Sequence, residues 1–333
     1  MKIGKKSKIL ITLLILIALL ASSFALDFSK EDIKYGITFS SVYARDELHL
    51  NWQETYTAIL DDLKVDNIRL SAYWNQIENE RDIYNFDDLD WQIEEASKRN
   101  VNITLAVGRR LPRWPECHDP LWISHLSKEE IRTEQLELVG LVVNRYKDNP
   151  NIKTWQVENE PFLRAFGICP SLDKEALNQE IKLVRDLTDT PILVTDTGEL
   201  NLWISAARTG ADTIGSTLYR VVYNENIGYT KYPIPAWFYY AKATMIKTLF
   251  GTRNVINSEL QAEAWHTEEK DLTQMSLEDQ FKSMDLEQLE KNISFSQKAG
   301  FDEIYLWGAE WWYFLKVNRD YPHLWEEAKN LWQ

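Results

Sequence analysis

Residues 67–107, NIRLSAYWNQIENERDIYNFDDLDWQIEEASKRNVNITLAV, contain one complete strand–helix–strand unit and decide the fold. The segment begins with a short apolar, β-rich run at Asn67–Ser71 and ends with a second one at Asn102–Val107. Between them, Asp87–Lys98 carries apolar residues three and four positions apart, which is the period of an amphipathic helix. Because two strands joined through a helix can run side by side in the same direction, this unit predicts a parallel sheet.

The same alternation continues along the chain. The predicted strands are Tyr35–Phe39, Asn67–Ser71, Asn102–Val107, Thr154–Glu158, Ile192–Thr195, Asp212–Leu218, Asn254–Glu259 and Glu303–Trp307. The predicted helices are Trp52–Leu63, Asp87–Lys98, Ser127–Tyr146, Ser171–Leu187, Trp203–Ala207, Pro235–Phe250, Leu277–Lys298 and His323–Trp332. Alternating units over about 300 residues favour closure into a (β/α)8 TIM barrel. An open doubly wound sheet is the alternative, but Ser40-Ser41-Val42 stands where that fold has a glycine-rich phosphate turn.

The first 25 residues have the order of a signal peptide. Four lysines, Lys2, Lys5, Lys6 and Lys8, precede an apolar run at Ile9–Leu20, and Ser23-Phe24-Ala25 offers small residues for cleavage. An uncleaved membrane anchor is the alternative, although the run is short for a bilayer span of about 20 residues. We therefore expect an exported chain, secreted or tethered on the extracytoplasmic side, with one barrel domain at 26–333.

The chain is strongly acidic, with a formal net charge of −14. Loss of residues 1–25, which hold four lysines and no acid, would change this to −14 − 4 = −18. Such a surface repels nucleic acid, which is therefore not an expected partner. The five histidines are scattered and form no HExxH motif or Cys/His cluster, so neither a metal nor another cofactor is expected.

Two of the predicted strands end in a glutamate. The fourth continues as WQVENEP at residues 155–161, and the seventh contains NSELQ at residues 257–261. In barrels of this kind functional groups lie at the C-terminal ends of the strands. We therefore expect the two glutamates to point into one pocket. A lone acidic residue at such a position is more often a helix cap than a catalyst, but two of them, on strands 4 and 7, favour a catalytic role.

The pattern resembles that of clan A glycoside hydrolases, which have Asn-Glu, often followed by Pro, at the end of strand 4 and a second glutamate at the end of strand 7. The matching residues are Asn159-Glu160-Pro161 and Glu259. The resemblance implies a retaining hydrolase that cleaves β-glycosidic bonds of an oligo- or polysaccharide, with Glu160 as acid/base and Glu259 as nucleophile. By strand alternation Glu158 would share a face with Glu160, so the Asn-Glu-Pro motif selects Glu160.

Other positions agree with the family. Arg69 stands where the family has an arginine that orients the catalytic carboxylates, and Asn159 would bind the 2-hydroxyl of the sugar. Tyr219 and Trp307, at the ends of strands 6 and 8, match a tyrosine near the nucleophile and a tryptophan that floors the sugar subsite. The chain departs at strand 3, where Gly108-Arg109-Arg110 replaces a histidine of several families, so the family and the sugar stay unassigned.

Further tryptophans and one glutamine are candidate substrate contacts because they follow strand ends. Trp74 and Gln261 are expected near the pocket. For Trp114, Trp311 and Trp312 the sequence leaves open whether they line the pocket or belong to the core.

The chemistry needs two carboxyl groups in different states. In retaining enzymes they lie roughly 5–5.5 Å apart, and inverting enzymes need about 6.5–9.5 Å to admit water. Glu160 would have to stay protonated near neutral pH, which burial and the charge of Glu259 would favour. Arg69 would hold Glu259 ionised.

The two cysteines lie in neighbouring loops, Cys117 after strand 3 and Cys169 after strand 4. We predict a disulfide between them, closing 169 − 117 = 52 residues, which is worth up to about 4 kcal/mol in the chain-entropy model. Two other functions remain open at this stage. One is a barrel that binds carbohydrate without cleaving it, and the other is a metal-dependent barrel hydrolase, which the scattered histidines disfavour.

Overall fold

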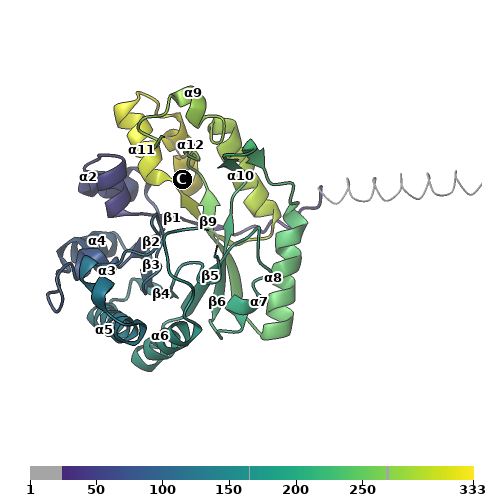
Figure 1. Ribbon diagram of the computed structural model, residues 1–333. Coiled ribbons are helices and arrows are strands. Elements are labelled where there is room, and N and C mark those ends of the chain that lie inside the picture. Colours follow the sequence, from purple (N-terminus) through teal and green to yellow (C-terminus); the bar gives the residue numbers. More distant parts are fainter. Residues whose placement is uncertain (1–24, 165, 268–269) are drawn as a thin grey trace, which may run out of the picture.

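A computed structural model describes residues 25–333 except 165, 268 and 269. In these residues, eight parallel strands close into a barrel that helices surround (Figure 1). The order around the ring is β1-β10-β9-β6-β5-β4-β3-β2. The predicted (β/α)8 barrel is therefore confirmed. The predicted leader lies outside the described residues except for Ala25.

Each barrel strand overlaps one of the eight predicted strands. The barrel strands are β1 (Lys34–Thr38), β2 (Asn67–Ser71), β3 (Asn102–Val107), β4 (Ile152–Val157), β5 (Ile192–Asp196), β6 (Thr213–Leu218), β9 (Asn254–Gln261) and β10 (Glu303–Trp307). A separate antiparallel hairpin of β7 (Val221–Asn224) and β8 (Gly228–Lys231) follows β6 and was not predicted.

The helices occupy the connections between the strands. The α-helices are α2 (Trp52–Ala58), α3 (Trp74–Ile77), α4 (Asp87–Lys98), α5 (Lys128–Tyr146), α6 (Lys174–Leu187), α7 (Ile204–Ala207), α8 (Ala236–Phe250), α9 (Leu277–Gln280), α10 (Leu286–Lys298), α11 (Ala309–Asn318) and α12 (His323–Lys329). Short π- or 3₁₀-helical turns lie at η1 (Tyr43–Glu47), η2 (Ile59–Leu63), η3 (Leu121–His125) and η4 (Asn330–Trp332). The predicted start of α5 is confirmed, because Ser127 and Glu130 form a reciprocal capping box.

Several helices differ from the prediction, among them α3, which was not predicted. The expected helix Leu277–Lys298 is two helices, because Asp285 accepts a hydrogen bond from the backbone of Gln288 and so caps a new start. The unpredicted α11 begins directly after Gly308, whose φ of 138° lets the chain turn from β10 into a helix. Trp311 and Trp312 lie on α11 and have no exposed surface, so both belong to the core.

Two loops at the C-terminal ends of the strands are joined covalently. Cys117 and Cys169 form the predicted disulfide, with their Cα atoms 5.3 Å apart. This bond links the loop after β3 to the loop after β4. Among the described residues, no helix is both long enough and apolar enough to span a membrane.

Candidate active site

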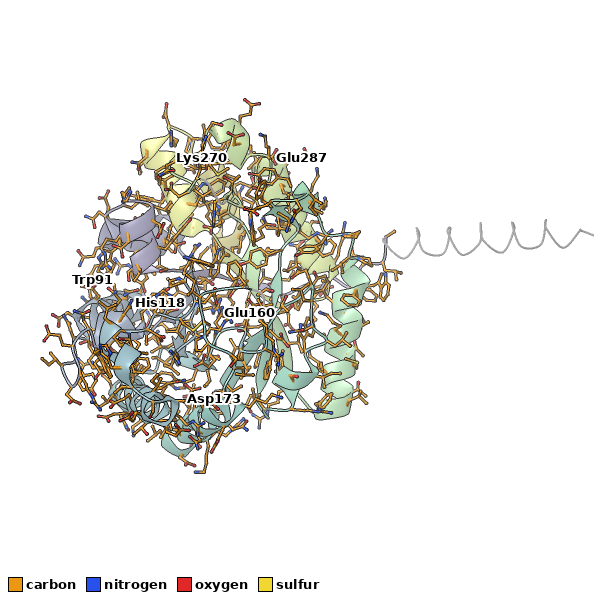
Figure 2. The ribbon with its side chains drawn as sticks, viewed as in Figure 1. Trp91, His118, Glu160, Asp173, Lys270 and Glu287 are labelled. Atoms are coloured by element: carbon orange, nitrogen blue, oxygen red, sulfur yellow. A yellow bond between two sulfur atoms is a disulfide. The ribbon has the colours of Figure 1, made fainter. Side chains whose placement is uncertain are left out.

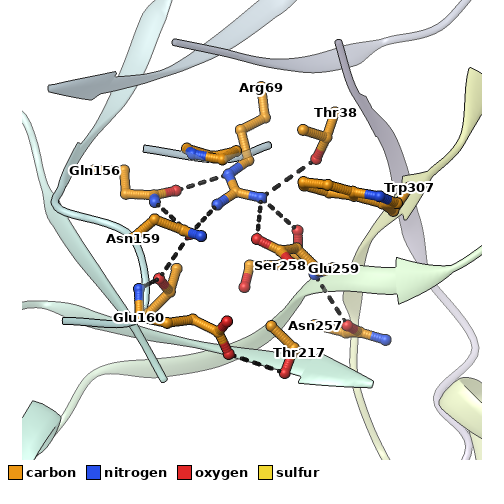
Figure 3. A network of polar contacts seen from close by, with 12 residues as sticks. Thr38, Arg69, Gln156, Asn159, Glu160, Thr217, Asn257, Ser258, Glu259 and Trp307 are labelled. Atoms are coloured by element: carbon orange, nitrogen blue, oxygen red, sulfur yellow. Dashed lines mark hydrogen bonds and ion pairs between the residues drawn. The ribbon is translucent and has the colours of Figure 1, made fainter. Parts of the chain in front are cut away.

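The strand ends bring Glu160 and Glu259 into the same polar network at the mouth of the barrel (Figure 3). The Oγ1 of Thr217 donates a hydrogen bond of 3.2 Å to Oε1 of Glu160. Thr217 also pairs in register with Glu259 across the neighbouring strands β6 and β9. Both glutamates are buried, with 6% and 3% of their surfaces exposed. Glu160 lies over the centre of the ring, whereas Asp173 lies at its periphery (Figure 2).

Arg69 on β2 ties the network together from inside the barrel. Its Nη1 donates to Oε1 of Glu259 at 2.9 Å, and its Nη2 donates to Oδ1 of Asn159 at 2.7 Å. Its Nε donates to Oε1 of Gln156 at 2.7 Å, and the side chain has no exposed surface. A buried guanidinium in contact with a carboxylate favours the charged form of that carboxylate. The sequence placed Arg69, Asn159 and Glu259 together, and the structure brings them together.

Glu160 has the opposite environment. Among the described residues it forms no ion pair, and its backbone N–H donates to Oγ1 of Thr195 at 2.8 Å. Burial raises the pKa of Glu160 well above its ordinary value, and the negative charges of Glu259 and Glu116 raise it further. The Glu160 carboxyl therefore keeps its proton in a pH range where an exposed glutamate has lost it.

Tyr219, directly after β6, contacts the second glutamate. Its hydroxyl donates to Oε2 of Glu259 at 3.1 Å. Its backbone N–H donates a hydrogen bond of 3.0 Å to Oε1 of Glu199. Burial and the neighbouring charge of Glu259 raise the pKa of Tyr219 well above its usual value, so the phenol stays a donor. Tyr219 thus lies where the sequence placed it, beside Glu259.

Glu158 does not share the face of Glu160, and the expectation from strand alternation is wrong. Its two carboxylate oxygens accept hydrogen bonds from the backbone N–H groups of Arg109, at 2.7 Å, and Arg110, at 2.8 Å. The reason is the backbone at Glu158, where φ is +59° and the alternation of an extended strand ends. Glu158 therefore braces the start of the loop after β3, and only Glu160 reaches the network of Glu259.

Trp307, at the end of β10, lies in the same region but is largely covered. Its Nε1 donates to Oε1 of Glu263 at 2.9 Å, and 7% of its surface is exposed. The guanidinium of Arg113, from the loop after β3, stacks on the indole with its central carbon 4.1 Å from the ring centre. Arg113 also forms ion pairs with Glu263 and with Glu310. Trp307 is therefore one side of a charged cluster.

Two predicted contact residues are not brought to this network, and the expectation for them is corrected. Trp74 has no exposed surface, and its Nε1 donates to Oε2 of Glu78 at 2.8 Å, so it offers no face to a sugar. The side-chain oxygen of Gln261 accepts from the backbone N–H groups of Arg220 and Val221, at 2.8 and 2.9 Å. Gln261 therefore fixes the loop after β6.

Glu116 is a functional candidate that the sequence analysis missed. Its Oε2 accepts a hydrogen bond of 3.1 Å from Nδ2 of Asn159 and lies 3.5 Å from Nε of Arg110. Burial raises the pKa of Glu116 to about 7, and the negative charge of Glu259 contributes to the rise. The loop that carries Glu116 has no periodic pattern. The only signal was its neighbour Cys117, whose predicted bond to the loop after β4 placed this segment beside Asn159 and Glu160.

One acidic group in the described part of the chain has the spacing of cation ligands. It consists of Glu78, Asp82 and Glu134. Arg81 already forms an ion pair with Glu134, and Glu78 accepts from Trp74 and from the backbone of Asp82. These oxygens have protein partners and do not belong to the network of Glu160.

The geometry defines a class: a parallel (β/α)8 barrel with two buried carboxyl groups, one paired with arginine, at the C-terminal ends of β4 and β9. No protein-family model matches the chain. Among solved structures it is similar to xylanase 10B from Thermotoga petrophila, with 15% identity, a TM-score of 0.55, and coverage of 83% of this chain and 82% of that one.

Two further structures show the same likeness. A family 1 β-glucosidase from Thermotoga maritima has 12% identity and a TM-score of 0.53, over 85% of this chain and 89% of that one. The GH5_18 protein from Streptomyces cattleya has 12% identity and a TM-score of 0.59, over 84% and 71%. The structural neighbours thus include glycosidases of clan A, and at these identities the likeness establishes the shared fold.

Proposed function

We propose that the protein is a retaining glycoside hydrolase that cleaves β-glycosidic bonds, with Glu160 as acid/base and Glu259 as nucleophile. The observation that carries the proposal is the unequal environment of two buried carboxyl groups. Glu259 is bonded to Arg69 and Tyr219, whereas Glu160 has no ion-pair partner among the described residues and a raised pKa. One carboxyl is paired with a guanidinium and the other has a raised pKa, an asymmetry that suits double displacement. The barrel shared with clan A glycosidases supports the same class.

The reaction proceeds in two displacements. The carboxylate of Glu259 attacks the anomeric carbon, the bond from that carbon to the leaving oxygen breaks, and Glu160 gives its proton to the leaving oxygen. A water molecule then attacks the same carbon, Glu160 takes up the water proton, and the ester bond to Glu259 breaks. The product keeps the β configuration because the carbon is inverted twice.

The surrounding residues have positioning and binding roles in this proposal. Arg69 pairs with Glu259 and orients the amide of Asn159. Nδ2 of Asn159 donates one hydrogen to Glu116 and would donate its second to the 2-hydroxyl of the sugar. Tyr219 donates to Glu259 before the attack and can stabilise it as a leaving group in the second step.

The test is hydrolysis of a panel of 4-nitrophenyl β-glycosides. We expect Glu160→Ala and Glu259→Ala each to lower kcat/KM at least a thousandfold, while Glu290→Ala, an exposed acid on α10, serves as the matched control. Proton NMR of the first product formed should show the β anomer. If both variants keep wild-type turnover, the residue assignment fails, and an α anomer as first product would exclude the retaining mechanism.

A barrel that binds carbohydrate without cleaving it is the alternative from the sequence. It predicts glycan binding with no turnover across the panel. The retained pair of carboxyls with Arg69 and Tyr219 in contact with Glu259 favours the enzyme.

We also propose that the chain is exported. The disulfide between Cys117 and Cys169 supports this, because such bonds persist in oxidising compartments. N-terminal sequencing of the protein from its native source, with cell fractionation, would distinguish a cleaved leader from a retained anchor. Recovery of the chain in the cytoplasm with both thiols free would contradict export.

A further inference from the structure

The loop after β3 reaches across the mouth of the barrel and carries a buried arginine, Arg113. The guanidinium of Arg113 lies between the rings of Tyr43, 3.7 Å from its central carbon to the ring centre, and Trp307, at 4.1 Å. It forms ion pairs with Glu263 and, at 3.2 Å, with Glu310. We call these five residues the Arg113 wall.

The Arg113 wall divides the mouth into two arcs. Arg113 follows β3 and Glu263 follows β9, and these two strands lie opposite each other in the ring of eight. The line between them leaves β2, β1 and β10 on one side and β4, β5 and β6 on the other. Arg113 itself is only 4% exposed. At Arg113 the mouth is therefore closed by protein.

The wall is fastened at several points, so it is part of the folded structure. The carbonyl of Pro112 accepts from the hydroxyl of Tyr73 at 2.9 Å, and the carbonyl of His118 accepts from the backbone N–H of Asn75 at 2.9 Å. The disulfide between Cys117 and Cys169 holds the far side of the loop.

The positions of the proposed nucleophile and acid determine how the substrate is oriented across the mouth of the barrel. In a double displacement the sugar under attack lies over the nucleophile, and the leaving group lies beside the acid. The leaving group is therefore on the side of Glu160 and β4. The strand directly opposite β4 in the ring is β10, which carries Trp307. The non-reducing end of the attacked sugar thus points at the Arg113 wall.

We propose that the enzyme removes single, neutral, terminal sugars from the non-reducing end of its substrate, because the Arg113 wall leaves no room for a second unit. This proposal rests on the proposed function. The wall balances one guanidinium against Glu263 and Glu310 and so offers no excess positive charge to an acidic sugar.

Two buried polar atoms of the wall have no hydrogen-bond partner in the described part of the protein. They are Nε of Arg113 and Oε2 of Glu263. A buried donor or acceptor without a partner costs about 1–3 kcal/mol, so such atoms are usually matched. Hydroxyls of the terminal sugar would supply the missing acceptor and donor.

The opposite side of the mouth suits the rest of the substrate. Trp114 is 55% exposed and Phe166 is 40% exposed, with ring centres 5.6 Å apart. Trp265 extends this row at 6.4 Å from Phe166. Exposed aromatic faces stack on sugar rings or on an aromatic leaving group.

The decisive experiment compares free and blocked ends with the wild-type protein. Each 4-nitrophenyl β-hexoside that is cleaved in the panel is assayed again with a 4,6-O-benzylidene group on the same sugar, and the matching disaccharide glycosides are assayed with product analysis. We expect the blocked sugar to react at least tenfold more slowly, and a disaccharide glycoside to release a monosaccharide first.

The outcomes distinguish failure of the terminal-sugar proposal from failure of the proposed glycoside hydrolase function. A blocked substrate cleaved within tenfold of the free one, or release of an intact disaccharide, overturns the terminal-sugar proposal and leaves the glycosidase standing. If neither the unblocked monosaccharide glycosides nor the disaccharide glycosides are cleaved, the proposed glycosidase function is wrong and the terminal-sugar proposal fails with it.

Variants of the two sides give an independent check. Arg113→Ala should open the wall. The ratio of the rate on the free sugar to the rate on the blocked sugar should then fall at least tenfold. Trp114→Ala, the matched control on the exposed side, should raise KM for the aromatic leaving group and keep the ratio of the two rates. Circular dichroism shows whether the Arg113→Ala variant is folded. If the variant is unfolded, the ratio of the rates of the wild-type protein on free and blocked sugars still tests the proposal.

Discussion

Replacement of Arg69 by methionine should destabilise the fold and abolish activity together. The side chain is fully buried and donates to Glu259, Asn159, Gln156 and the carbonyl of Ser258. Methionine has similar length but no charge and no donors. Loss of one partner from a buried ion pair costs about 3–5 kcal/mol, because the remaining carboxylate stays buried without its cationic partner. That is a large part of a total stability of about 5–15 kcal/mol.

The assay is urea unfolding followed by fluorescence, with Arg99→Met as the matched control. Arg99 also pairs with two carboxylates, Asp61 and Glu95, but its side chain is 25% exposed. A surface pair of this kind is worth about 0–1 kcal/mol. A loss below about 1 kcal/mol for Arg69→Met, equal to the control, would refute the view that Arg69 compensates a buried charge.

Four further predictions concern the neighbouring loops. Glu116→Gln removes a negative charge near Glu160, so the pKa of Glu160 should fall and the basic limb of the kcat/KM profile should move to lower pH; an unmoved limb would contradict this. Because the pKa of Glu116 is raised to about 7 in the fold, its proton stabilises the folded state at low pH, and wild-type stability should fall more than that of Glu116→Gln between about pH 4.5 and 7. The double variant Cys117→Ser/Cys169→Ser should lose up to about 4 kcal/mol in urea unfolding, and no loss would mean that the 52-residue loop is equally restricted without the bond. Gly108→Ala places a Cβ 2.5 Å from a buried carboxylate oxygen at a φ of +120°, so it should cost about 1–3 kcal/mol, with wild-type thermal stability as the contrary result.

Regular elements followed from local patterns in the sequence. The eight strands overlap their predictions because a buried parallel strand needs a short apolar run, and that need is met within each segment. Helix starts such as Ser127 follow from capping, which involves residues three apart. The pairing of Cys117 with Cys169 also followed, because neighbouring loops of a barrel lie on one face.

Errors arose where one residue changed the direction of the chain. The positive φ at Glu158 turned that side chain away from Glu160. Gly308 started the helix α11, which was not predicted. Backbone turns of this kind depend on the packing of distant segments, so the local pattern does not contain them.

The sequence by itself determined the barrel, the strand ends that carry Glu160 and Glu259, and the disulfide, because these depend on periodicity, chain order and neighbouring loops. Only the tertiary structure decided that Glu116 lies beside Asn159 and that Arg113 crosses the mouth to Glu263. These two contacts join residues 43 and 150 positions apart, and both start from the irregular loop after β3. Their energies depend on burial and on exact side-chain position, which the fold sets and the local sequence does not.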